Sequence, residues 1–234
     1  MLLRRKRKHR RRLWAPILAL ILMAVVAAEA RLLFSDAYLG APDLSFISRI
    51  LHRQTDWRLI LVNSRHAVPS DYEPALLRLS NGVEVDERIY PDLQEMFDAA
   101  RAQGVNPTVV EGYRSHEDQT AMMQSYVDRY IGQGYDRSEA EVMAREYVAE
   151  PGTSEHELGI AVDVGAGSGS GAEQVYAWLA ENAYEYGFIL RYPEDGEEIT
   201  GIAYEPWHYR YVGREAALEI YTRDITLEEY LKAR

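Results

Sequence analysis

The stretch Ser154-Glu155-His156-Glu157-Leu158-Gly159-Ile160-Ala161-Val162-Asp163 joins a polar segment that ends in glycine to an apolar segment that contains a carboxylate. Residues 160–164 have the length and composition of a buried strand. Asp163 is therefore expected in apolar surroundings, where an unpaired carboxylate is costly. This cost predicts a partner for Asp163 from elsewhere in the fold.

Two further segments place polar residues on or beside apolar ones, Glu205-Pro206-Trp207-His208 and Tyr113-Arg114-Ser115 followed by Gln119. His156, Asp163 and His208 together offer two imidazoles and one carboxylate. Such a set suits a catalytic zinc ion, which takes three protein ligands and keeps a fourth position open. We interpret these three residues as candidate metal ligands.

Zinc-dependent hydrolysis also needs a base and a group that stabilises negative charge. Glu205 lies three residues before His208, a spacing that would separate the two side chains on a regular strand. Pro206 favours a bend that aims both inward. Arg114 is a permanently charged candidate to stabilise a developing oxyanion. These residue types taken singly are common, so a binding module without catalysis stays open, as does an acidic adaptor that docks a protein partner.

The chain has 234 residues, no cysteine and a net charge of −11. The absence of cysteine excludes a disulfide scaffold and any Cys-ligated metal site. Residues 1–30 carry +7, which leaves −18 for residues 31–234. Since phosphate binding needs a basic face, this composition argues against a nucleic-acid partner.

The N-terminus has the pattern of an export signal. Eight Lys and Arg residues fall within residues 4–12, and residues 13–28 carry no charge. We expect residues 1–12 to be cytoplasmic, residues 13–34 to form a transmembrane signal-anchor, and residues 35–56 to form a stalk. This orientation predicts a single-pass protein of the bacterial cell membrane with an extracytoplasmic body. A cleaved signal peptide remains the alternative, because Ala28-Glu29-Ala30 fits a cleavage site.

Residues 57–234 are expected to form one folded domain of mixed strands and helices. The apolar pattern predicts strands at 57–62, 107–114, 160–164, 188–192 and 204–212, and helices at 86–103, 115–130, 138–149 (capped by Ser138), 172–186, 215–221 and 227–231. The elements do not alternate strictly, so we predict an α+β fold with a small antiparallel sheet flanked by helices, preceded by the N-terminal membrane helix. Glu155 and Glu157 flank His156 and are candidates to support the metal ligands, but we favour solvent-facing positions for both.

At these residues the sequence resembles the VanY-type zinc D-Ala-D-Ala carboxypeptidases, a group that also includes lysostaphin-type enzymes and the hedgehog domain. The pattern Ser-x-His-x-x-Gly-x-Ala-x-Asp is complete at residues 154–163, Glu-Pro-Trp-His at 205–208, and Tyr-Arg-Ser with Gln at 113–119. Together with an entry segment that begins at Leu61-Val62-Asn63, the resemblance covers roughly residues 57–213. It implies a hedgehog/D-Ala-D-Ala-peptidase-like fold.

The resemblance also implies roles for individual residues. His156, Asp163 and His208 would bind Zn²⁺, and Glu205 would act as general base. Arg114 would hold the substrate carbonyl or terminal carboxylate, helped by Ser154 and Gln119. The implied substrate is a peptidoglycan stem peptide from which the terminal D-alanine is released. Whether the enzyme is a D,D-carboxypeptidase, an L,D-carboxypeptidase or an L,D-endopeptidase stays open, as does a non-catalytic wall-peptide binding module.

Overall fold

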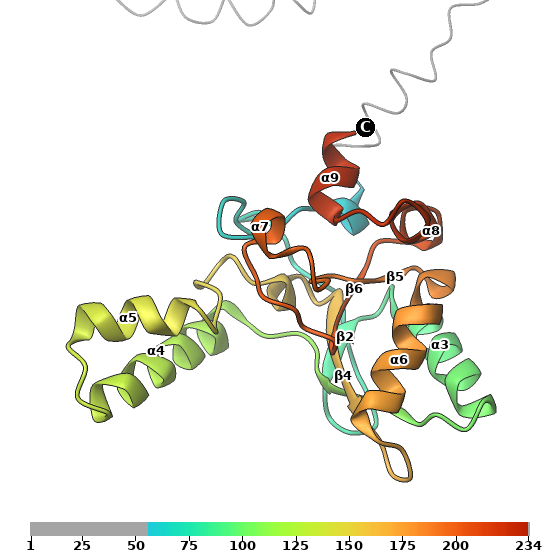
Figure 1. Ribbon diagram of the computed structural model, residues 1–234, viewed down its shortest axis with the longest axis horizontal. Helices are drawn as coiled ribbons and strands as arrows, with labels where there is room; N and C mark the ends of the chain where they lie inside the picture. The colour runs from blue at the N-terminus through green and yellow to red at the C-terminus, as the bar shows by residue number, and fades with distance from the viewer. Residues whose placement is uncertain (1–55, 234) are drawn as a thin grey trace, which may run out of the picture. The chain divides into compact units, whose positions relative to one another are not determined.

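The computed structural model describes residues 56–233. These residues form a mixed α+β fold with two small antiparallel sheets (Figure 1). The first sheet pairs β1 (Leu76–Arg78) with β2 (Glu84–Asp86). The second has four strands in the order β3-β4-β6-β5. Their bounds are β3 (Pro107–Glu111), β4 (Ala161–Ala166), β5 (Phe188–Leu190) and β6 (His208–Tyr211).

Helices lie on both sides of the four-stranded sheet and extend beyond it (Figure 1). The α-helices are α3 (Tyr90–Ala102), α4 (His116–Gly132), α5 (Arg137–Arg145), α6 (Ala172–Asn182), α7 (Glu197–Thr200), α8 (Arg214–Arg223) and α9 (Leu227–Lys232). Three short 3-10 helices complete the set: η1 (Trp57–Leu59), η2 (Glu155–Leu158) and η3 (Ala183–Tyr186).

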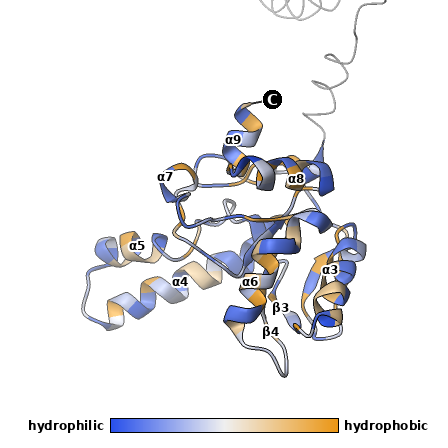
Figure 2. Cartoon of the chain, turned by 45° about the vertical axis from the view of Figure 1, so that its right-hand side comes forward, coloured by the Kyte–Doolittle hydropathy of each residue, from blue (hydrophilic) through white to orange (hydrophobic). Residues whose placement is uncertain are grey.

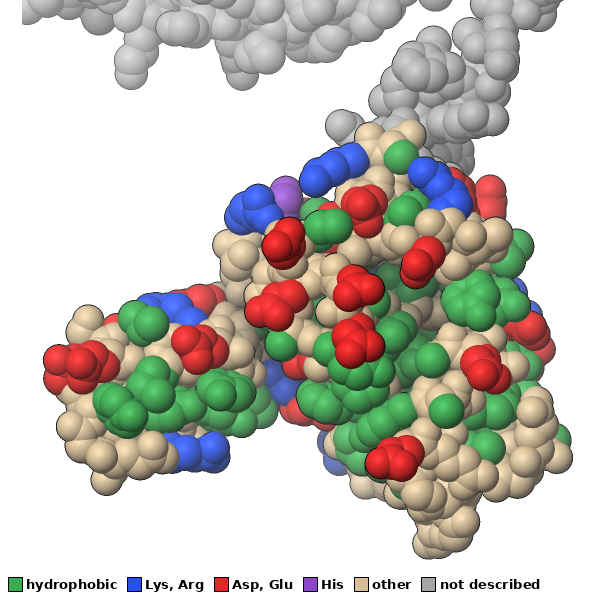
Figure 3. Space-filling view, viewed as in Figure 1, with side chains coloured by type: hydrophobic (Ala, Val, Ile, Leu, Met, Phe, Trp, Pro, Cys, Tyr) green, Lys and Arg blue, Asp and Glu red, His purple; other side chains and the backbone are tan. Residues whose placement is uncertain are grey.

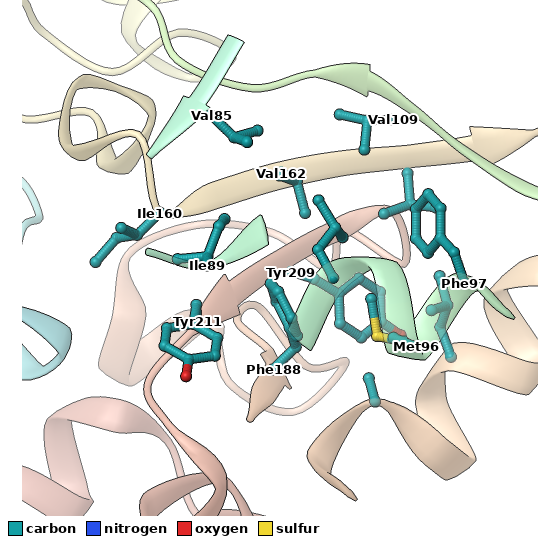
Figure 4. Close-up of a cluster of buried hydrophobic side chains, with 14 of the residues drawn as sticks. Val85, Ile89, Met96, Phe97, Val109, Ile160, Val162, Phe188, Tyr209 and Tyr211 are labelled. Carbon is teal, nitrogen blue, oxygen red and sulfur yellow. The ribbon is translucent and has the colours of Figure 1, made fainter. Parts of the chain in front are cut away.

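The main core lies between the sheet and helices α3 and α6. In α3, Leu93, Met96, Phe97 and Ala100 are buried, and their spacing of three and four residues is that of one helix face. Figure 2 shows apolar and polar residues mixed along both helices, as expected for helices with one buried side. Strand side chains meet this face in the cluster of Figure 4. This apolar packing holds the sheet in place, and Asp163 and His208 lie on two of its strands.

A second group of helices forms a projecting hairpin. Helices α4 and α5 pack against each other through Val127, Ala140 and Ala144, and extend to one side of the sheet (Figure 1). Ser115 caps α4 by accepting from the Asp118 backbone N–H. We call residues 116–145 the α4–α5 hairpin. Hydrophobic side chains gather on its visible face in Figure 3.

Three predicted elements differ from the structure. Residues 57–62 form η1 and an extended segment rather than a strand, because Arg210 donates to the backbone carbonyls of Arg58 and Ile60 and occupies positions that a neighbouring strand would take. The strand expected at 204–212 covers only 208–211, since residues 205–207 form a turn.

The third difference concerns α5. This helix begins at Arg137, is capped by Asp136 and ends at Arg145. The predicted helix starts at a Ser138 cap and runs to residue 149. Asp136 and Glu139 form a reciprocal capping box, which fixes the first turn two residues earlier than expected. The other predicted strands and helices are present with their ends shifted by a few residues, whereas β1, β2, η2 and α7 were not predicted.

The expected membrane helix at 13–34 lies outside the described residues, as do the basic segment 1–12 and most of the stalk. Between residues 56 and 233, no helix is long and apolar enough to cross a membrane.

Candidate metal centre and active site

Antiparallel pairing of β4 and β6 brings Asp163 and His208 together. The two residues are register partners across the strands, and side chains in such a pair project on the same side. His208 Nδ1 lies 3.0 Å from Asp163 Oδ1. Two residues that are 45 positions apart in sequence therefore become neighbours through strand register.

His156 reaches the same point from the turn before β4. It lies in η2, which ends at Gly159 in the left-handed conformation (φ 70°), and this turn folds the chain back over the strand. His156 Nε2 lies 3.6 Å from Asp163 Oδ1. Each of His156, Asp163 and His208 offers one ligand atom, and these three atoms lie within 4.8 Å of one another.

The donor set fits a zinc ion. Asp163 Oδ1 is buried and has no hydrogen-bond partner among the described residues, although it lies between two imidazoles. The other ring nitrogen of His156, Nδ1, lies 2.8 Å from the carbonyl of Gly112, which accepts its proton and leaves Nε2 as a free lone pair. Two neutral imidazoles and a carboxylate that converge in this way are suitable ligands for Zn²⁺.

The pKa shifts of His208 and Asp163 also indicate that the site favours a bound positive charge. Burial lowers the pKa of His208, but the attraction of the adjacent Asp163 and Glu155 carboxylates outweighs it and raises this pKa to about 9. Burial raises the pKa of Asp163, but the two imidazoles lower it well below its usual range. The carboxylates thus hold a positive charge at His208, and a metal ion would take the place of that proton.

Glu205 lies beside the candidate ligands. The turn at 205–207 is held by a hydrogen bond from the Glu205 N–H to the Tyr192 carbonyl and one from the His208 N–H to the Glu205 carbonyl. Glu205 Oε2 consequently lies 3.8 Å from His208 Nδ1, and 27 % of the Glu205 side chain is exposed. The expected bend at Pro206 is present, and it places both side chains on the same side.

Burial raises the pKa of Glu205, and the charge of Asp163 adds to this effect, while His208 opposes it. A carboxylate with a raised pKa is better matched to proton transfer near neutral pH. Its position at the rim of the metal site is therefore suited to a base.

Arg114 lines the same cavity, and two neighbouring side chains hold its guanidinium. Its Nε donates to Glu111 at 2.8 Å and its Nη1 donates to Gln119 at 2.6 Å. The Arg114 backbone N–H donates to the carbonyl of His156, which ties the two segments together.

These residues line one cavity of about 480 Å³. Arg114, Ser154 and Glu205 contribute to its wall together with the three candidate ligands, and Met122 and Tyr126 of the α4–α5 hairpin line it as well. A larger cavity of about 790 Å³ lies between α6, η3 and α8, and it contains none of these residues. Because the titratable groups and metal-ligand atoms converge in the smaller cavity, we assign the active site there.

Residues 82–214 match the family model of VanY, D-alanyl-D-alanine carboxypeptidase. The chain belongs to this family. It is 52 % identical over 179 residues to a D-alanyl-D-alanine carboxypeptidase of Enterococcus faecalis, a match that covers 76 % of this chain and 67 % of that protein. It is 38 % identical over 191 residues to the putative carboxypeptidase YodJ of Bacillus subtilis, with 74 % of this chain and 67 % of that protein covered.

Solved structures agree with this VanY assignment. The fold is similar to VanYB in complex with D-alanine-D-alanine, with a TM-score of 0.73 and 52 % identity over 76 % of this chain and 99 % of that one. A VanY mutant from a VanB-type resistance cassette, in complex with Zn(II), gives a TM-score of 0.71 and 53 % identity over 75 % and 99 % of the two chains. The LD-carboxypeptidase LdcB is also similar, with a TM-score of 0.65 and 35 % identity over 76 % of this chain and 88 % of that one. The chain is a zinc metallopeptidase of the VanY type.

Gln119 lies in a different place from the one that its expected contact with substrate requires. Its side chain is fully buried and absent from the cavity wall. Its oxygen accepts from Arg114, and its Nε2 donates to the Ala149 carbonyl at 2.7 Å. Gln119 therefore supports Arg114 from behind instead of facing the cavity.

The prediction that Glu155 and Glu157 face solvent is wrong, since both are buried. Glu155 Oε2 lies 3.6 Å from His208 Nε2. Glu157 accepts from the Gly152 N–H at 2.7 Å and lies 3.0 Å from His116 Nδ1. Local sequence does not reveal the burial of Glu155, because the arginines that balance its charge are distant in the chain.

Proposed function

We propose that this protein is a zinc-dependent D,D-carboxypeptidase that removes the terminal D-alanine from peptidoglycan stem peptides. The observation that carries the proposal is the convergence of His156, Asp163 and His208 within 4.8 Å, beside Glu205 and in one cavity with Arg114. The similarity to D,D-enzymes at 52–53 % identity, against 35 % for the LD-carboxypeptidase, favours a D-alanyl-D-alanine end.

The three ligands would hold the zinc ion through His156 Nε2, His208 Nδ1 and an oxygen of Asp163. A zinc ion at this position supplies Lewis acidity that makes a water molecule easier to deprotonate and a carbonyl easier to attack. Glu205 accepts the proton of the attacking water and passes it to the leaving amine as the peptide bond breaks.

Arg114 binds the negative charge of the substrate. Nε and Nη2 both contact the Glu111 carboxylate and Nη1 donates to Gln119, so the guanidinium plane is fixed and one N–H on each of Nη1 and Nη2 remains. These donors stabilise the oxyanion or hold the terminal carboxylate of the peptide. Ser154, buried in the cavity wall beside His156, is proposed as a further contact to the substrate.

The purified full-length chain, incubated with pentapeptide-, tetrapeptide- and tripeptide-ended stems, tests this proposal by mass spectrometry. We expect loss of one D-alanine from the pentapeptide, suppression by a chelator and recovery with zinc. Cleavage of the tetrapeptide instead would identify an L,D-carboxypeptidase. A cut inside the stem would identify an endopeptidase, and metal-independent binding without cleavage would identify a binding module.

We also propose that residues 13–34 anchor the protein in the cell membrane, with the catalytic domain outside the cytoplasm. The basic segment 1–12 before an uncharged run supports this orientation. Membrane fractionation followed by protease treatment of intact spheroplasts tests it. A soluble, shortened product would indicate a cleaved signal, and protection from protease would contradict the orientation.

A further inference from the structure

A buried ion network extends from the metal site to the C-terminal helix. Arg191 follows β5, Arg210 lies on β6, Glu155 precedes His156, and Glu228 lies in α9. The side chains of Arg191, Arg210 and Glu155 are fully buried, and only 6 % of the Glu228 side chain is exposed. Two positive and two negative groups balance one another, so none remains as an uncompensated buried charge.

Glu155 is the member that touches the metal site. Its Oε2 and the Nε2 of His208 are both buried, lack hydrogen-bond partners among residues 56–233, and lie 3.6 Å apart. Once a metal ion takes the place of the Nδ1 proton, the carboxylate is placed to hold the remaining proton of His208 on Nε2, so that Nδ1 is the ligand atom beside Asp163. In His156 a backbone carbonyl holds the proton on Nδ1 and Nε2 is the ligand atom, whereas in His208 a side chain is placed to hold the proton on Nε2.

Arg191 fixes Glu155 from the other side. Its Nε donates to Glu155 Oε1 at 2.8 Å, while Nη1 and Nη2 donate to the two oxygens of Glu228 at 2.9 and 2.7 Å. The Arg191 backbone N–H also donates to the carbonyl of His208. The guanidinium plane is therefore held at both edges, and loss of the Glu228 edge would free it to rotate.

We propose that Glu228, acting through Arg191 and Glu155, is a positioning residue for the metal ligand His208. Helix α9 thereby contributes to the active site without contacting the cavity. This inference rests on the proposed function, because it requires zinc at the predicted ligands. The residues matched by the family model end at 214, so Glu228 lies outside them.

The purified full-length protein and its variants can test the proposal by zinc affinity, measured by competition with a chromophoric chelator well below the unfolding temperature. We expect Glu155→Gln to weaken zinc binding by about 10- to 100-fold, as for other residues that orient metal-bound histidines. Glu228→Gln should weaken it by about 2- to 30-fold, the range for residues that act through a packed network. The Co(II) spectrum should change in both variants, because the position of His208 changes.

Glu229→Gln is the matched control, since Glu229 lies on the same helix and caps it through Thr226 without contacting Arg191. It should lower thermal stability and leave zinc affinity and the Co(II) spectrum unchanged. If Glu155→Gln does not fold, Arg191→Lys retains the buried charge but cannot bridge both carboxylates, and it should show the same loss as Glu228→Gln.

Wild-type zinc affinity and spectrum in Glu228→Gln would overturn the inference, as would an equal loss in Glu229→Gln. If the wild-type protein binds no zinc at all, the proposed function itself fails. The two failures are therefore distinguished by the wild-type titration.

Discussion

Arg114 Nη1 lies 2.6 Å from the side-chain oxygen of Gln119, and Gln119 in turn donates to the carbonyl of Ala149. The orientation of a guanidinium in the active-site cavity is thus tied to the loop that follows α5. Two contacts therefore orient Arg114, one to Glu111 and one to the fully buried side-chain amide of Gln119.

Replacement of Gln119 should impair catalysis without removing a substrate contact. We expect Gln119→Ala to lower kcat/KM by about 10-fold or more, because Arg114 loses one of the contacts that fix its plane. Zinc content should stay at the wild-type level. Steady-state kinetics on a pentapeptide substrate measures the effect, and Gln124→Ala, an exposed position on the same helix, serves as the control. Unchanged kinetics in Gln119→Ala would remove its positioning role.

Glu205→Gln should reduce kcat by about 10²- to 10⁴-fold, the usual contribution of a general base. Bound zinc should be nearly intact, because Glu205 is not one of the three converging ligands. Turnover and metal content measured on the same preparation separate these effects, and Glu198→Gln on exposed α7 is a matched control. A variant that keeps its activity would exclude Glu205 as the base.

His208→Ala should lose bound metal. Removal of one of three protein ligands leaves two, and a catalytic zinc site needs three. Elemental analysis after dialysis gives the metal content, with His66→Ala, an exposed histidine outside the cavity, as the comparison. Normal zinc content in His208→Ala would contradict the ligand assignment.

The metal-free protein should become less stable as the pH rises from 6.5 to 9. The pKa of His208 is raised to about 9 in the folded state, above its ordinary 6.5, so protonation stabilises the fold fully below 6.5 and is lost as the pH passes 9. Zinc replaces this proton, so the loaded protein should not show the same decline. Thermal unfolding of both forms across this range makes the comparison, and parallel curves would argue against a charged His208.

Gly112→Ala should destabilise the fold and weaken zinc binding together. A Cβ at this position would overlap the backbone carbonyl of Glu84 and the side chain of Val83, so the loop that follows β3 must shift at a cost of about 1–3 kcal/mol. The Gly112 carbonyl accepts from His156, and the shift should disturb that ligand too. Gly132→Ala, where a Cβ would meet nothing nearby, is the control. A variant with unchanged stability would show that the loop relaxes freely.

Local pattern was sufficient for most elements. Apolar spacing predicted α3, and Ser115 predicted the start of α4, because these depend on interactions within a few residues. The strand expected at 57–62 was wrong for a non-local reason, since its carbonyls are satisfied by a side chain 150 positions away. No local pattern carries that information.

The sequence by itself determined the chemical inventory of the site: two histidines, an aspartate and a glutamate in motifs whose residue types suit zinc and a base. Tertiary structure decided which other groups support them. Antiparallel register set Asp163 opposite His208, and burial turned Glu155 and Gln119 inward to contacts with arginines. The reason is physical: ligand identity is a property of single side chains, whereas the partner of a buried charge depends on which distant segments the core brings beside it.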